Sequence, residues 1–326
     1  MSPLDFTILF IKIVVVLGVL LNMVPLLVWV ERRGAAFIQD RPGPNRVGPL
    51  GLFQPLADAL KFIFKEDPIP FHVDPVLFIL APLFALIPAV VTFAAIPFGD
   101  TIELFGRTIT LQVADMNIGI LYILAFGSLG VYGILIAGWA SNNKYSTLGA
   151  LRSSAQMISY EIAMGAALVG PLMIYETFSL KEMVFRQEAI WGIFLQPLAF
   201  VIVLIAAFAE CNRLPFDLPE GEAEIVAGYH TEYGSMKFAI FFMAEYLHVV
   251  TICSLIATLF LGGWHLIPGM VTVAEWVGIP TFPTSVGLSL LQVASFCIKT
   301  AFMIWIFIWV RWTFPRFRYD QLMNLG

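Results

Sequence analysis

Long apolar stretches separated by short polar segments run through the whole chain. About 20 consecutive apolar residues are enough to cross a bilayer as a helix. The chain is therefore predicted to be an all-α integral membrane protein with about seven transmembrane helices. The predicted spans are Phe6–Val30, Val76–Pro97, Ile118–Trp139, Met157–Tyr175, Leu195–Ala209, Phe238–Leu261 and Leu288–Trp312. These runs are continuously apolar rather than alternating, which excludes a closed barrel.

Residues 51–65 follow a different pattern, with apolar and polar residues on opposite faces of a helix. The apolar face is formed by Phe53, Leu56, Leu60, Ile63 and Phe64. Because this segment is too short and too charged to cross, it is predicted to be an amphipathic helix in the membrane interface, with its apolar face toward lipid or a lipid-like ligand. Packing of that face on neighbouring spans is the alternative.

Composition agrees with a single polytopic membrane domain over residues 1–326. The mean hydropathy is +0.86, and 59% of residues are hydrophobic while 13% are charged. No nucleic-acid partner is expected. The cysteines Cys211, Cys253 and Cys297 are far apart in the sequence, which argues against a disulfide framework or a metal cluster carried by this chain.

The distribution of basic residues predicts the orientation. Most of the 18 lysines and arginines follow the first, third, fifth and seventh spans, and the opposite side holds only Arg107, Lys181 and Arg186. The positive-inside rule therefore places the N-terminus outside. Two inner segments are noteworthy. Residues 39–51, after a first span that ends in Glu31–Arg33, contain glycines and prolines that predict a tight loop. Residues 137–161 form a polar loop that enters the fourth span.

The segment from Glu210 to Lys237 is the most polar part of the chain. It contains six carboxylates among apolar and small residues, namely Glu210, Asp217, Glu220, Glu222, Glu224 and Glu232. A solvated loop would account for this composition. A folded, partly buried segment is the other interpretation, in which neighbouring carboxylates raise one another's pKa and can handle protons.

Ionisable residues inside apolar spans carry further information, because a charge at mid-membrane is normally kept only beside a partner or a water-filled path. Glu161 and Glu245 fit that description, and structural hydrogen bonds are the alternative role for each. Glu245 and His248 also form an E-x-x-H pair, which is typical of di-iron bundles, but such sites need a second copy. No metal site is predicted. Nucleotide, redox-dithiol and nucleophile-elbow motifs are absent.

Four long motifs resemble one family of membrane subunits in respiratory complex I, the NADH:quinone oxidoreductase. This is the H-subunit family, whose mitochondrial member is called subunit 1. The motifs are ERRGAAFIQDRPGPNRVGPLGLFQPLADALKFIFKE, GWASNNKYSTLGALRSSAQMISYE, AECNRLPFDLPEGEAEIVAGYHTEYGSMKFAIFFMAEY and PRFRYDQLM. The resemblance implies a subunit that forms the membrane side of the quinone chamber and begins proton coupling. FMN and iron–sulfur clusters would lie in partner subunits of the hydrophilic arm, which would dock on the inner loops beside other membrane-arm subunits.

The resemblance also implies roles for individual residues. Quinone binding would involve Arg32, Arg41, Asp58, Phe241 and Phe242. The proton-coupling candidates are Glu161, Glu210, Asp217, Glu220, Glu222, Glu224, Glu232 and Glu245. Their polar partners would be Arg213, Tyr233 and Glu31.

The resemblance predicts an eighth span after RYDQLM, and the chain ends at Gly326 without it. Two other functions stay open at this point. One is the related anchor subunit of a membrane-bound hydrogenase or of another quinone- or phenazine-linked dehydrogenase, in which the EGEAEIVAGYHTEYGSMKF sequence is missing or varied. The other is a secondary transporter, which an inverted repeat would support, but no such repeat is found.

Overall fold

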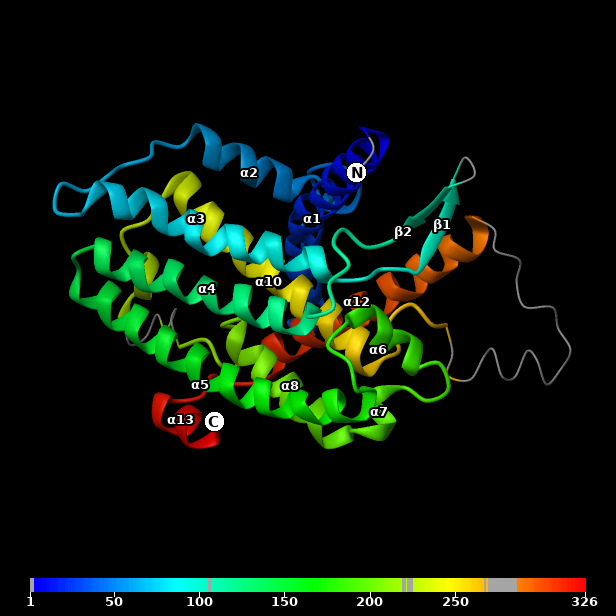
Figure 1. Ribbon diagram of the computed structural model, residues 1–326. Helices are drawn as coiled ribbons and strands as arrows, with labels where there is room; N and C mark the ends of the chain where they lie inside the picture. The colour runs from blue at the N-terminus through cyan, green and yellow to red at the C-terminus, as the bar shows by residue number, and fades with distance from the viewer. Residues whose placement is uncertain (1–2, 105–106, 219–220, 222–224, 267, 269–285) are drawn as a thin grey trace, which may run out of the picture.

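The computed structural model describes residues 3–104, 107–218, 221, 225–266, 268 and 286–326. Helices form most of this part of the chain (Figure 1). The longer helices are α1 (Pro3–Ile38), α2 (Gln54–Phe64), α3 (Pro75–Val91), α4 (Gly119–Ala140), α5 (Lys144–Tyr175), α8 (Pro197–Glu210), α10 (Ser235–Phe260) and α12 (Val286–Thr313). The short elements are η1 (Pro49–Gly51), η2 (Thr92–Ala95), β1 (Thr101–Leu104), β2 (Arg107–Thr110), α6 (Leu180–Arg186), α7 (Gly192–Leu195), η3 (Gly228–His230) and α13 (Tyr319–Leu325).

Six of these helices are long and apolar enough to cross a membrane, which confirms an all-α integral membrane protein. The fifth predicted span, Leu195–Ala209, is the exception. Its helix α8 has 14 residues, or about 21 Å at 1.5 Å per residue, against a hydrocarbon core of about 30 Å. Gln196 has a non-helical backbone and separates α8 from α7.

Two helices continue well beyond their predicted spans. α1 extends through the Glu31–Arg33 sequence to Ile38. α5 begins at Lys144, where the Asn143 side chain accepts a hydrogen bond from the backbone N–H of Tyr145. The prediction of a polar loop over residues 137–161 is therefore wrong for most of its length. The error arose because small polar residues such as serine lower the hydropathy without preventing a helix once both faces are packed.

α10 is the central helix, and two thirds of its most apolar 18-residue stretch is buried. It packs against α1, α2, α3, α8 and α12, while α4 lies between α3 and α5 in a neighbouring layer (Figure 1). Close approach of α3 and α4 depends on Gly133, where an added Cβ would lie 2.6 Å from the backbone N of Ala85. Gly133 is therefore a point of close helix packing, whereas Gly130, one turn away, has open space beside it.

The segment between α1 and α2 is a tight turn, as its glycines and prolines predict. Gly51 has φ +73°, and a Cβ there would lie 2.4 Å from the Pro44 carbonyl group. α2 follows, and its predicted apolar face is exposed at Leu56 (48%), Leu60 (55%) and Phe64 (84%). The opposite side of α2 contacts α1 and α10. The apolar face is therefore not covered by other parts of the chain that the structure describes, which favours a lipid-facing role.

A short hairpin of β1 and β2 lies between α3 and α4 and pairs antiparallel, with Thr101 opposite Thr110. The sequence did not predict these strands. They lie at the same end of the molecule as the start of α12 (Figure 1), where the Ser289 hydroxyl donates a hydrogen bond to the Thr101 carbonyl oxygen at 2.8 Å.

Candidate functional site

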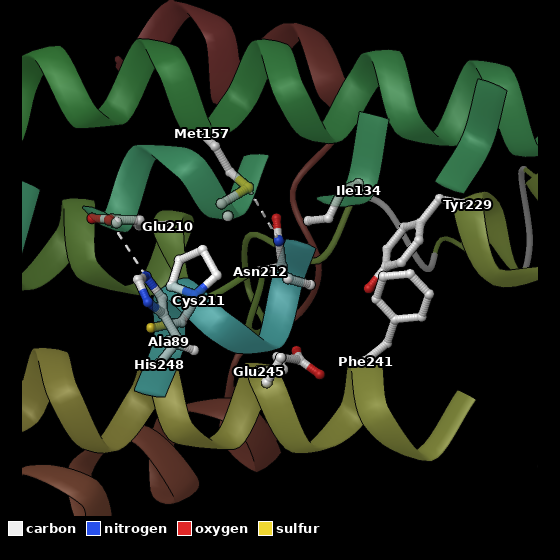
Figure 2. Close-up of a pocket in the computed structure, with 15 residues that line it drawn as sticks. Ala89, Ile134, Met157, Glu210, Cys211, Asn212, Tyr229, Phe241, Glu245 and His248 are labelled. Carbon is white, nitrogen blue, oxygen red and sulfur yellow. Dashed lines mark hydrogen bonds and ion pairs between the residues drawn. The ribbon is translucent and has the colours of Figure 1, made fainter. Parts of the chain in front are cut away.

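A cavity lies between α3, α4, α5, α8 and α10. Its empty volume, including the open mouth, is about 520 Å³. One wall is apolar or small, and the other carries the polar groups of α8, α10 and the segment between them (Figure 2). The lining includes Gly127 of α4, Glu210 of α8, Asn212 of the following segment, and Glu245 and His248 of α10. Two of the predicted acids, from different helices, therefore share one cavity.

Glu210 is the last residue of α8, and its side chain is only 8% exposed. Its Oε1 lies 3.4 Å from Nε2 of His248 on α10 (Figure 2). Neither Glu210 Oε2 nor His248 Nε2 has a hydrogen-bond partner among the described residues. Glu161 on α5 is close enough to both groups to interact with them electrostatically. Glu210 and His248 thus meet at this wall, and Glu161 from a third helix is within electrostatic range of both.

A second cluster surrounds Glu31, which is buried near the end of the predicted first span. Arg311 Nη1 on α12 lies 2.6 Å from Glu31 Oε1. Tyr246 on α10 donates a 2.6 Å hydrogen bond from its hydroxyl to Glu31 Oε2, and Arg213 Nη1 lies 3.6 Å from the same oxygen. One carboxylate therefore joins α1, α10, α12 and the segment that follows α8.

Arg213 connects the two clusters. Its Nε lies 3.4 Å from Glu245 Oε1, and its guanidinium lies over the Tyr246 ring, 4.2 Å from the centroid. Burial disfavours the charged form, but the nearby Glu245, Tyr246 and Glu31 more than offset this effect, so the pKa of Arg213 is raised above its ordinary value. The result is a continuous series of buried and partly buried ionisable groups from Arg311 through Glu31, Arg213 and Glu245 to the cavity.

The segment that carries Arg213 is fixed by a buried glutamine of α5. Gln156 Nε2 donates hydrogen bonds to the carbonyl oxygens of Ala209 at 2.7 Å and Phe216 at 2.8 Å. An amide buried among helices stays only where its hydrogen bonds are made. Gln156 therefore holds both ends of the turn after α8 and sets the position of the acidic segment.

The remaining predicted acids lie apart from this series. Asp217 is buried and pairs with Arg316, with Oδ2 2.7 Å from Nη2. Glu232 accepts a 2.7 Å hydrogen bond from Asn143 and lies 3.8 Å from His72. Glu220, Glu222 and Glu224 lie outside the described residues. For the described part of the segment, the burial of Glu210, Arg213 and Asp217 makes a fully solvated loop wrong.

Two of the residues predicted to bind quinone are in contact. Arg32 Nη1 on α1 lies 2.5 Å from Asp58 Oδ2 on α2, with the two side chains 47% and 23% exposed. Arg41 is exposed and donates from Nε to the Gln39 side-chain oxygen at 2.7 Å, apart from that pair. The structure thus brings two of these three polar residues together.

Phe241 and Phe242 face different surroundings on α10. Phe241 is buried, lines the cavity and contacts the Tyr229 and Tyr233 rings. Phe242 packs on Tyr246, 4.9 Å between ring centroids, on the side of the Glu31 cluster. Consecutive helix residues point about 100° apart, so one surface cannot be lined equally by both.

Tyr233, predicted as a polar partner, is instead packed among rings. It stacks on Phe78 at 4.0 Å with an interplanar angle of 12°. Its hydroxyl has no hydrogen-bond partner among the described residues, and burial raises its pKa above the ordinary value. Tyr233 therefore fixes the end of the acidic segment against α3.

Sequence reasoning missed three members of the site. Arg311 entered only as a charge for orientation, and Tyr246 was not singled out. His248 was considered with Glu245 as a metal pair, yet its contact is Glu210. Among the described residues there is no group of three or more His, Cys, Asp or Glu side chains arranged for a metal ion. The available signal was weak, since only the E-x-x-H spacing on an apolar helix marked His248.

Helices of membrane-crossing length, packed around buried and partly buried ionisable groups, define a multi-pass membrane protein. The chain belongs to the NADH dehydrogenase family, whose model matches residues 11–326. This membership agrees with the resemblance to the H-subunit family and excludes a free-standing transporter of another family.

Similar proteins match over nearly the whole chain, and each of the three that follow is named as an H subunit of NADH-quinone oxidoreductase. The H subunit 1 of Geobacter metallireducens is 50% identical, covering 100% of this chain and 93% of the relative. The H subunit of Bdellovibrio bacteriovorus is 49% identical, covering 97% and 90%. That of Flavobacterium johnsoniae is also 49% identical, covering 96% and 88%.

Proposed function

We infer that this chain is the H-type membrane subunit of a proton-translocating NADH:quinone oxidoreductase. The observation that carries this inference is similarity near 50% over the full chain to proteins of that name. The buried series from Arg311 to the cavity supports it, since intramembrane charges of this kind mark ion or proton pathways. The chain is accordingly a subunit of an oxidoreductase, and its relatives act within a larger assembly.

The subunit forms the membrane side of the quinone chamber. The exposed apolar face of α2 provides a surface for an isoprenoid tail at the membrane interface. Beside it, the Arg32–Asp58 pair joins α2 to the charged end of α1, where a polar headgroup could be met. Arg41, Phe241 and Phe242 complete the residues assigned to quinone in this proposal.

Quinone reduction takes up two electrons and two protons, so negative charge develops transiently in the chamber. Acids whose proton affinities depend on one another respond to such charge by moving protons, because a change of one pKa unit corresponds to about 1.36 kcal/mol. In this proposal Asp217, Glu220, Glu222, Glu224 and Glu232 sense the charge. The response then passes inward through the buried Glu210 and the partly buried Glu161 and Glu245, with Glu31, Arg213 and Tyr233 as polar partners.

The proposal assigns the redox cofactors to partner subunits. FMN and iron–sulfur clusters belong to the hydrophilic arm, which docks on the loops that follow the odd-numbered spans, and other membrane-arm subunits cover further helix faces. The location is an energy-transducing membrane, bacterial cytoplasmic, with the N-terminus outside and the acidic segment inside, as the distribution of basic residues supports.

Purification from intact membranes tests the assembly. The chain, tagged and extracted in mild detergent, is expected in a large complex with flavin and iron–sulfur absorbance that reduces quinone with NADH. Recovery as a stable monomer without cofactors would contradict the proposal. Hydrogen- or phenazine-dependent activity in place of NADH oxidation would instead support the related anchor subunit of a hydrogenase or another dehydrogenase.

Substitutions in the purified complex test the coupling role. Glu161→Gln, Glu222→Gln and Glu245→Gln each keep size and hydrogen bonding while removing the ionisable proton. At least one should abolish coupled quinone reduction while NADH oxidation by an artificial acceptor at the hydrophilic arm stays nearly intact. Normal assembly must be verified by native electrophoresis. Three variants that assemble and pump like wild type would show that these acids are structural contacts.

A further inference from the structure

The cavity of Figure 2 contains a histidine that the proposed carboxylate path does not use. His248 lies on α10, in the turn after Glu245, and both side chains line the same empty space. On its other side it approaches Glu210 of α8, with Nε2 3.4 Å from Oε1. The histidine therefore lies between two of the acids that the proposed function joins.

The polar atoms at this point are buried without being satisfied. Glu210 is 8% exposed, and its Oε2 makes no hydrogen bond among the described residues; the same is true of His248 Nε2. A buried polar atom without a hydrogen bond costs free energy, so such an atom normally indicates a bound water molecule or a functional role. The adjoining space is bordered by Glu210, His248, Glu245 and Asn212, which gives water molecules the several polar partners they need.

The other walls add no competing charge. The residues of α3 and α4 that line the cavity are Ala85, Pro88, Ala89, Gly127, Gly130 and Ile134. The ionisable groups around His248 and its cavity are consequently Glu161 from α5, Glu210 from α8, Cys211 and Tyr229 from the segment between α8 and α10, and Glu245 from its own helix. Arg213 lies beyond Glu245, with which it pairs. Three acids are thus grouped around a single imidazole.

We propose that His248 carries protons between Glu210 and Glu245, a role that rests on the proposed function of the subunit. In the first step the O–H bond of the protonated Glu210 carboxyl breaks and an N–H bond forms on Nε2, which leaves a carboxylate beside an imidazolium. In the second step the imidazolium releases a proton through cavity water to the Glu245 carboxylate, and neutral imidazole is restored. Histidine suits this exchange because its charge changes readily near neutral pH.

The distance fits a transfer that needs only a small movement. Proton exchange occurs at about 2.6–3.2 Å between heavy atoms or through one water, and the ground-state separation here is 3.4 Å. Gly127 on α4 keeps bulk away from the pair, because even a single methyl group at this position would come into van der Waals contact, with its Cβ 3.4 Å from Glu210 Oε1 and 4.0 Å from His248 Cε1.

The test uses His248→Gln and His248→Lys in the intact purified complex. Glutamine keeps a polar side chain without a proton that titrates, and lysine keeps a positive charge that is not released near pH 7. Both variants should lose about tenfold or more of coupled quinone reduction at pH 7, while NADH oxidation by an artificial acceptor stays within twofold. The lysine variant should recover activity as the pH is raised, and the glutamine variant should not.

His265→Gln is the matched control. His265 is a second partly buried histidine, and its Nε2 contacts the Val184 carbonyl oxygen at 3.1 Å, away from the cavity. Quinone reduction within twofold of wild type is expected for it. If His248→Gln weakens assembly, Gly127→Val gives a second measurement. A methyl group at Gly127 would only touch the pair, but the two further carbons of valine extend past that contact and crowd it while both ionisable groups remain, so a loss of threefold or more is expected.

Three outcomes overturn the proposal. The first is an assembled His248→Gln complex with activity within twofold of wild type. The second is full activity of His248→Lys at pH 7, which would assign His248 to charge pairing alone. The third, where the glutamine variant cannot be assembled, is normal turnover of Gly127→Val. Failure of the proposed function is recognised separately, because the wild-type complex itself would then lack NADH-driven quinone reduction.

Discussion

The buried carboxylate of Glu31 offers the sharpest test of how the helices are held together. It pairs with Arg311 at 2.6 Å and Arg213 at 3.6 Å and accepts the Tyr246 hydroxyl at 2.6 Å. Glu31→Gln keeps the shape but leaves two buried or half-buried guanidinium groups without this counter-charge. Breaking a buried pair from one side costs about 3–5 kcal/mol. Because Arg311 is 20% exposed and Arg213 retains Glu245, we expect a value near the lower end, about 3 kcal/mol.

Tyr246→Phe provides an internal scale. It removes one hydrogen bond to the same charged group, which is worth about 1.5–3 kcal/mol, so its effect should be smaller than that of Glu31→Gln. Glu176→Gln is the control, because the Glu176–Arg186 pair is 77% and 49% exposed and such pairs contribute about 0–1 kcal/mol.

The assay is the fraction of intact complex that survives short heating in detergent, measured by native electrophoresis over a temperature series. Glu31→Gln should lower the midpoint most, Tyr246→Phe less, and Glu176→Gln hardly at all. An equal midpoint for Glu31→Gln and Glu176→Gln would refute the argument that this carboxylate joins the four segments.

Three further predictions concern other parts of the chain. Leu60→Lys, on the exposed face of α2, should reduce activity with long-tailed quinones at least threefold more than activity with short-tailed quinones. The control Lys61→Glu should affect both activities alike. Equal losses of the two activities for Leu60→Lys would mean that the helix is only structural. Gly51→Ala should lower the free energy of unfolding by about 1–3 kcal/mol, because Gly51 has φ +73° and an added Cβ would lie 2.4 Å from Pro44. The measured effect is faster heat inactivation. Gly18→Ala, which has nothing within 4 Å of its added methyl group, should be neutral. Burial lowers the pKa of His265 below its ordinary value of 6.5, so the folded state binds fewer protons at this residue than the unfolded state does. The contribution of His265 to stability is therefore full above about pH 6.5 and is lost as the pH falls toward the folded pKa. His265→Gln should accordingly flatten the dependence of heat stability on pH below about pH 6.5.

The sequence by itself determined the membrane class, the places of the apolar helices and the interfacial helix. These features follow from local composition, because the bilayer requires about 20 apolar residues in a row and an amphipathic pattern shows within four turns. It also predicted the tight turn around Gly51, since glycine and proline act on their own backbone. Long motifs pointed to the family, which the match over residues 11–326 confirmed.

The tertiary structure decided which polar groups meet. Glu31, Arg213, Tyr246 and Arg311 come from four separate segments, and no spacing in the sequence reveals that they share one carboxylate. The helical state of most of residues 137–161 also depended on packing, because serine and asparagine favour helices or loops according to what surrounds them. His248 has a clear spacing only to Glu245, yet its contact is Glu210 on another helix. Charge in a membrane is stabilised by partners brought from distant segments, and only the packed helices determine which partners those are.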